Sequence, residues 1–318
     1  MKAFALRVGL FTPAVSSWFM TAFLLAGRFL VAALVLSCFE RTLPSKRELA
    51  QGLWLGLFAG GGHWLQADGL NWTDASTSAF LTQGYVVVLP FLAAIEMHKF
   101  PERRVLRAVL LNLVGLAVLA RFNPLTLTLG RGEAETLIAA VLFAGQIFSI
   151  SRPRYAQNRT GPVTMVMFLT VGLGAVPLAA AAASPTDLAR FTGSLELWML
   201  LGLVAIFCTL LPFLLMNRYQ RFVSASEAGV IYGAEPVLAS ALALFLPAVL
   251  SPIAGVRYEN ERLTIRLLVG ATLVTCAALL LRSQATNSLA SGPPAPGTPN
   301  PPRALDPSEA PELSRAGD

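Results

Sequence analysis

Long apolar runs, separated by short polar segments, repeat along most of this chain of 318 residues. Each run holds about 16 to 23 residues, the length that crosses a hydrocarbon core of roughly 30 Å as a helix and not as a tilted strand. The pattern predicts ten transmembrane helices, at roughly 3–16, 18–38, 50–66, 75–95, 105–120, 136–151, 163–183, 197–216, 226–249 and 266–281.

The composition supports a membrane location. Hydrophobic residues make up 55% of the chain and charged residues only 13%, too few to cover a soluble protein of this size. A soluble enzyme fold is therefore excluded, and we expect an all-α membrane protein. The first span is short and is flanked or interrupted by Lys2 and Arg7, so a signal peptide is the alternative there. Residues 283–318 are rich in proline, serine and glycine, and predict a disordered tail.

Basic residues predict the orientation, because cytoplasmic loops are enriched in lysine and arginine. One set of alternate loops holds more than twice as many of them as the other. The richer set contains Arg41, Lys46, Arg47, Lys99, Arg103, Arg104, Arg107, Arg152, Arg154, Arg159, Arg218, Arg221 and Arg282. We expect these loops and both termini to be cytoplasmic. The net charge of +6 is spread over them instead of forming a stripe, so no nucleic-acid partner is expected.

The two halves of the chain share a weak pattern. Ala75-Ser76 leads into the fourth span as Ala225-Ser226 leads into the ninth, and each run then carries a proline, Pro90 or Pro236. Five crossings per half place the second half in the membrane upside down relative to the first. Such inverted repeats are typical of transporters with a shared cavity near the midplane.

The chain resembles the EamA-like branch of the drug/metabolite transporter superfamily. The resemblance covers residues 1–282 and rests on the order and spacing of short matches, at 27–33, 73–81, 85–90, 225–228, 234–237 and 260–264. It implies two five-helix repeats, 1–121 and 132–282. A Trp-Gly-Ser-like run that usually opens the family's first helix is missing, so we expect that helix to be truncated and Met1 to be an internal start. In-frame sequence upstream should encode a further apolar turn.

Two charges are predicted near mid-membrane, Arg28 in the second span and Glu235 in the ninth. Buried charges there are costly and usually face a cavity or a partner. Glu235 is a candidate proton or substrate-cation switch; a structural ion pair with Arg28 is the equal alternative. Tyr232 shares its helical face, and Pro236 removes a backbone hydrogen bond, which suits a gate or a packing kink.

Other polar residues within spans can line the same cavity or bond between helices. They are His63, Gln66, Gln83, Tyr85 and Gln146. Gly52, Gly56 and Gly60 repeat at four-residue spacing, which predicts close helix packing. Cys38, Cys208 and Cys276 lie in separate runs, so neither a disulfide nor a metal site is expected.

These features favour a secondary transporter that exports a small metabolite or drug-like compound across the bacterial inner membrane by alternating access, with protons as a candidate coupling ion. No phosphate-binding loop of the G-x-x-x-x-G-K type is present, so we expect no nucleotide cofactor. A lipid or lipid-linked sugar carrier is the alternative, and an intramembrane enzyme a weaker one, because only His63 and His98 could act as a histidine base. Expected partners are the substrate, membrane lipids and protons; a homodimer is left open.

Overall fold

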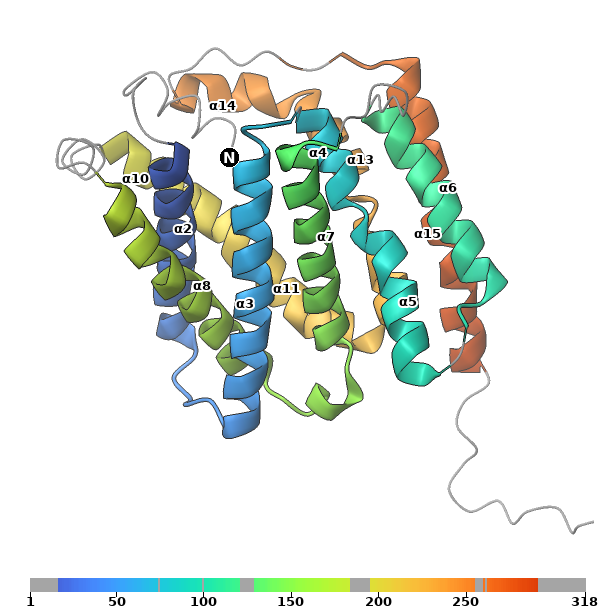
Figure 1. The fold of residues 1–318 in the computed structure, drawn as a ribbon, viewed down its shortest axis with the longest axis horizontal. Coiled ribbons are helices and arrows are strands. Elements are labelled where there is room, and N and C mark those ends of the chain that lie inside the picture. Colours follow the sequence, from blue (N-terminus) through green and yellow to red (C-terminus); the bar gives the residue numbers. More distant parts are fainter. Residues whose placement is uncertain are drawn as a thin grey trace, which may run out of the picture. The chain divides into compact units, whose positions relative to one another are not determined.

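The computed structural model describes residues 17–73, 75–98, 100–120, 129–183, 195–254, 260 and 262–290. These residues form helices joined by loops, with no strand among them (Figure 1). The helices are α2 (Ser17–Phe39), α3 (Lys46–Gly69), α4 (Ala75–Thr82), α5 (Tyr85–Met97), α6 (Arg103–Leu119), α7 (Arg131–Ile150), α8 (Thr160–Ala182), α10 (Leu195–Ala205), α11 (Leu211–Tyr219), α12 (Ala225–Tyr232), α13 (Glu235–Ala243), α14 (Leu246–Ala254) and α15 (Ile265–Ala290). Short 3-10 turns, η1 (Pro153–Tyr155) and η3 (Gln220–Phe222), cover two loops.

Five segments in the described residues are long and apolar enough to cross a membrane. They are Trp18–Phe39, Thr77–Glu96, Arg131–Ile150, Thr160–Ala182 and Leu197–Phe222. Each overlaps one of the spans predicted from the sequence, whereas the predicted span at 3–16 lies outside the described residues. The chain is thus an all-helical, multi-pass membrane protein.

Helix α3 is long but more polar than these five segments. It carries Gln51, His63, Gln66 and Asp68, and it is shielded because it packs between α7 and α8. A Cβ at Gly52 would lie 2.5 Å from Val166 Cβ, and one at Gly56 would lie 2.5 Å from Thr170 Cβ. The glycine spacing therefore brings α3 close to α8, which confirms the packing role predicted for it.

The fourth predicted span is not one helix. It divides into α4 and α5 at Gln83-Gly84, where the Gly84 N–H donates to Leu81 O at 2.9 Å and the Val87 N–H donates to Gly84 O at 3.0 Å. Pro90, the residue expected to disturb this run, lies inside α5. The helix breaks at Gly84 and not at Pro90. Glycine is, after proline, the residue least favourable to a helix interior.

The ninth predicted span, 226–249, is also wrong as a single helix. It divides into α12 and α13 at Gly233-Ala234, and then turns at Leu244-Phe245 into α14, which runs crosswise to α3 and α7 in Figure 1. Pro236 lies in the first turn of α13, where a missing N–H costs nothing. The proline thus begins a helix instead of loosening one.

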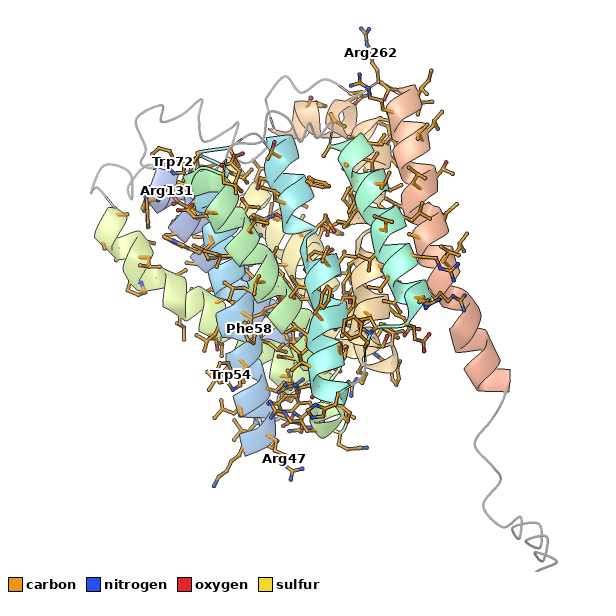
Figure 2. The ribbon with its side chains drawn as sticks, turned by 45° about the vertical axis from the view of Figure 1, so that its right-hand side comes forward. Arg47, Trp54, Phe58, Trp72, Arg131 and Arg262 are labelled. Atoms are coloured by element: carbon orange, nitrogen blue, oxygen red, sulfur yellow. The ribbon has the colours of Figure 1, made fainter. Side chains whose placement is uncertain are left out.

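The remaining predictions hold in part. The eighth span is continuous but contains a π-helical segment, η2 (Ile206–Leu210), between α10 and α11. The last helix continues to Ala290, beyond the predicted end at 281 and into the segment expected to be disordered; residues 291–318 lie outside the described residues. In Figure 2 Arg47 lies at one end of the bundle and Arg131 and Arg262 at the other.

Candidate functional site

The two helix breaks lie beside each other because α12 packs against α5. Contact is close: a Cβ at Gly229 would lie 2.5 Å from Leu89 Cδ1. Tyr85 begins α5 and is 6% exposed, Tyr232 ends α12, and Glu235 begins α13. The Glu235 carboxyl and the Tyr232 phenol both lie within electrostatic range of the Tyr85 phenol. Three predicted site residues therefore meet at this place, which we call the break site.

Two amide side chains border the break site. Gln83, next to Tyr85, is 5% exposed, and its Oε1 has no hydrogen-bond partner. Asn112 on α6 is fully buried, and its Nδ2 donates to Val230 O at 3.4 Å while its Oδ1 has no partner. A Cβ at Gly233 would lie 2.1 Å from Asn112 Nδ2, so this side chain lies directly against the α12–α13 break.

Asn112 was missed by the sequence analysis. The signal was present, since it is the one polar residue within the apolar run 108–120 of the sixth helix. Its meaning depends on Gly233, which is distant along the chain.

The Tyr232 hydroxyl has a structural partner. It donates to Gln220 Oε1 at 3.0 Å, and Gln220 Nε2 in turn donates to Ile147 O at 2.5 Å and Ser151 Oγ at 3.2 Å. Tyr232 thereby links the end of α12 to α7. Its ring borders the break site, while its hydroxyl is committed to this network.

Arg28 and His63 form a different group, on α2 and α3. Arg28 is 4% exposed, with its guanidinium 4.9 Å from the centre of the Phe29 ring. The His63 ring lies among Phe29, Phe143 and Phe213, at centroid distances of 5.9, 5.1 and 5.9 Å. Arg28 and Glu235 form no ion pair with each other. The structural ion pair that their predicted positions near mid-membrane suggested is therefore not present in this structure.

The two remaining candidates bond between helices. Gln66 Nε2 donates to Thr82 Oγ1 at 3.0 Å, joining α3 to the end of α4. Gln146 is 2% exposed, with its Nε2 3.9 Å from Met167 Sδ. Both contacts join two helices. Bonding between helices was the alternative to lining a cavity that the sequence offered for these residues.

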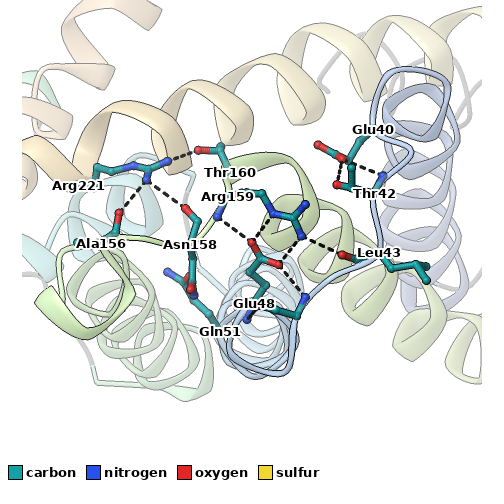
Figure 3. A network of polar contacts seen from close by, with 11 residues as sticks. Glu40, Thr42, Leu43, Glu48, Gln51, Ala156, Asn158, Arg159, Thr160 and Arg221 are labelled. Atoms are coloured by element: carbon teal, nitrogen blue, oxygen red, sulfur yellow. Dashed lines mark hydrogen bonds and ion pairs between the residues drawn. The ribbon is translucent and has the colours of Figure 1, made fainter.

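Polar contacts also fix both ends of α3. At its beginning lies the Glu48 cluster, comprising Glu48, Gln51, Asn158, Arg159 and Arg221 (Figure 3). Glu48 Oε1 accepts from Arg159 Nε at 2.8 Å and Glu48 Oε2 from Arg159 Nη2 at 2.8 Å, and Asn158 Nδ2 donates to Gln51 Oε1 at 2.8 Å. These bonds tie the start of α3 to the start of α8.

Arg221 closes the same cluster from a third element. Its guanidinium donates to Ala156 O and Asn158 O, both at 3.1 Å, and to the Thr160 hydroxyl. A small pocket lies between these groups, with Gln51, Thr160, Asn217 and Arg221 in its lining. The loop before α8 is thus held from both sides, by α3 and by η3.

At the other end of α3 is the Asp68 cluster, comprising Asp68, Thr73, Arg131 and Glu133. Arg131 Nη2 lies 2.5 Å from Asp68 Oδ2, and the Thr73 hydroxyl donates to Glu133 Oε1 at 2.5 Å. A Cβ at Gly69 would lie 2.9 Å from Gly132 O. Helix α3 is therefore joined at both ends to parts of the predicted second half.

The comparisons with known proteins agree with this architecture. Residues 133–248 match the EamA-like transporter family. A relative from Archaeoglobus fulgidus, described as an uncharacterized transporter, is 27% identical over 229 residues, which cover 71% of this chain and 68% of the relative. A solved crystal structure, described only as that of a protein, shares the fold with a TM-score of 0.61 and 17% identity, over 90% of this chain and 95% of the other.

The match lies within the second predicted repeat, the relative is named as a transporter and not as an enzyme, and the helices are those of a multi-pass membrane protein. The resemblance found in the sequence is thereby confirmed over residues 133–248, which are similar to the EamA-like transporter family, and the chain is a membrane transporter.

Proposed function

We propose that this protein is a secondary transporter of the bacterial inner membrane that exports a small metabolite or drug-like compound by alternating access. The observation that carries the proposal is the pair of adjacent helix breaks at Gly84 and Gly233, with Gln83, Tyr85, Asn112 and Glu235 around them. Discontinuous helices with polar groups at mid-membrane are the usual construction of substrate sites in secondary transporters.

The break site draws on both proposed repeats. Tyr85 and Asn112 belong to the five-helix repeat at 1–121, and Glu235 belongs to the repeat at 132–282. A compound bound between them would be exposed to either side by rocking one repeat against the other. The proposal requires ten helices, with the first incomplete and both termini cytoplasmic.

The polar clusters at the two ends of α3 supply candidate gates. With the Glu48 cluster on the cytoplasmic side, a bond between Glu48 and Arg159 would close the inner entrance, and a bond between Asp68 and Arg131 would close the outer one. Each gate would open only when its cluster separates. Because the clusters lie at opposite ends of one helix, movement of α3 relative to α7 and α8 would affect both.

Glu235 is the proposed coupling residue. No described basic side chain pairs with its carboxylate, and an ionisable residue within a span is a functional candidate by default. Binding and release of a proton there would link transport to the proton gradient.

The test compares metabolites in the medium of bacteria that express the chain, its Glu235→Gln variant, its Glu227→Gln variant or an empty vector, at matched membrane levels. Glu227 is the control because it is also a glutamate near the start of a helix, but its carboxylate forms a capping box with Ser224. We expect a compound enriched outside with the unmodified chain and with Glu227→Gln only. Equal export by Glu235→Gln would remove Glu235 from the mechanism, and no enrichment in any culture would count against export.

A further inference from the structure

Two amide oxygens in the break site are buried and have no partner, Gln83 Oε1 and Asn112 Oδ1. Their residues are 5% and 0% exposed. Buried polar atoms are almost always hydrogen-bonded in folded proteins, so an unpartnered one needs an explanation, such as a water or a ligand. Because the two oxygens lie at adjacent helix breaks, one bound molecule is the explanation that accounts for both.

Both unpaired atoms are amide oxygens, which can only accept hydrogen bonds. Asn112 Nδ2 donates to Val230 O, and turning the amide over would place two oxygens against each other. The orientation of Asn112 is therefore fixed by its surroundings. Gln83 Oε1 likewise has no hydrogen-bond partner. Any group that satisfies both oxygens must carry hydrogen-bond donors.

A carboxylate lies at the same place. Glu235 is two residues after Gly233, which contacts Asn112, and it lies within electrostatic range of Tyr85, which follows Gln83 closely in sequence. Its side chain is exposed, and it forms no ion pair with a described residue. Two neutral acceptors beside an unpaired negative charge complement a cation that donates hydrogen bonds.

We propose that the transported compound carries a protonated amine, which binds in the break site with its N–H groups on Gln83 Oε1 and Asn112 Oδ1 and its charge facing Glu235. This inference rests on the proposed function and adds the substrate class to it. A neutral compound would leave the carboxylate without a counter-charge. A quaternary ammonium would leave both amide oxygens unpaired.

The test measures binding of three related probes to the purified full chain in lipid nanodiscs at pH 7. Phenethylammonium has the charge and the donors, N,N,N-trimethylphenethylammonium has the charge alone, and 2-phenylethanol has no charge. We expect phenethylammonium to bind at least tenfold more tightly than either other probe. Gln83→Met and Asn112→Leu, which keep the side-chain volume, should each weaken its binding by about tenfold or more, since each removes a hydrogen bond to a charged donor.

Asn71→Leu is the matched control, because Asn71 is exposed and bonds only locally, to Ala67 O. Thermal unfolding shows whether each variant folds. Unchanged phenethylammonium binding by both Gln83→Met and Asn112→Leu would mean that the two oxygens bind water only, which overturns the proposal. So would equal affinity for the three probes, or no binding of phenethylammonium.

The export assay separates the two proposals. If phenethylammonium does not bind but the chain still enriches a compound in the medium, the amine inference fails and the exporter stands. If phenethylammonium does not bind and no compound is enriched in the medium, both proposals fail.

Discussion

Glu48 and Arg159 form a two-pronged ion pair, with Nε–Oε1 and Nη2–Oε2 distances of 2.8 Å each. The same carboxylate accepts the Arg159 backbone N–H at 2.9 Å and the Ser45 backbone N–H at 2.7 Å. Glu48 therefore serves both as the capping partner of α3 and as the anchor of the loop before α8. Paired bonds of this kind hold a fixed geometry as well as contributing energy.

Glu48→Gln should loosen this contact. It removes the charge and one acceptor, and we expect a loss of about 1 kcal/mol in the free energy of unfolding, since Arg159 is half exposed and the pair is partly screened. Thermal unfolding in detergent measures it. Glu227→Gln is the control because Glu227 makes the same capping box with Ser224 and no ion pair with a described residue. Equal losses in the two variants would assign the effect to capping alone.

The same pair predicts a dependence on pH. Hydrogen bonds from Arg159 lower the pKa of Glu48 below its ordinary value of 4.5. A lowered folded-state pKa means that the carboxylate stabilises the fold fully above about pH 4.5, and that this contribution declines as the pH falls toward the folded-state pKa. The stability difference between the unmodified chain and Glu48→Gln should therefore shrink from pH 6 to pH 3. A constant difference over that range would contradict the shift.

Helix positions could be predicted from the sequence because an apolar run of about 20 residues indicates a membrane-spanning helix without information from the rest of the chain. The ends of α2 and α8, for example, lie within a few residues of the predicted ones. The breaks at Gly84 and Gly233 were not predicted, because Pro90 and Pro236 were stronger local signals. A proline disrupts a helix only where its missing N–H would have been used, and that depends on where the helix begins.

The site was predictable only by residue type. Tyr85, Tyr232 and Glu235 were identified because polar groups are rare in spans, and the structure brings them together. Glu48 and Arg159 are 111 positions apart and lie outside the predicted spans, where charges are common. Nothing in a single sequence pairs such residues, and the same holds for Asn112 and Gly233.

Gly52→Ala should destabilise the contact between α3 and α8. The added Cβ would lie 2.5 Å from Val166 Cβ and 2.8 Å from Val163 O, so the helices must separate. Overpacking of this kind costs about 1–3 kcal/mol, which thermal unfolding would detect as a lower midpoint.

Gly60→Ala is the matched control for this substitution. It is on the same helix and in the same four-residue series, but its nearest neighbour would be Val171 Cγ2 at 3.6 Å, an ordinary contact. We expect its midpoint to be unchanged or slightly higher, because alanine favours a helix more than glycine does. Equal loss in both variants would show that the close contact with Val166 does not explain the result.

Gly233→Ala tests the contact that positions Asn112. The new Cβ would lie 2.1 Å from Asn112 Nδ2 and 2.9 Å from Asn112 Cγ, so the amide must swing away from Val230 O. We expect lower stability and at least tenfold weaker export, while Gly202→Ala, which meets nothing within 4 Å, leaves both unchanged.

Asn112→Ala removes the clashing group, so the double variant Gly233→Ala/Asn112→Ala should lose less stability than the two single losses added together, by about 1 kcal/mol or more. Its export should stay low, because the Asn112 amide is absent. Strict additivity of the stability losses would mean that the two residues do not contact each other in the membrane.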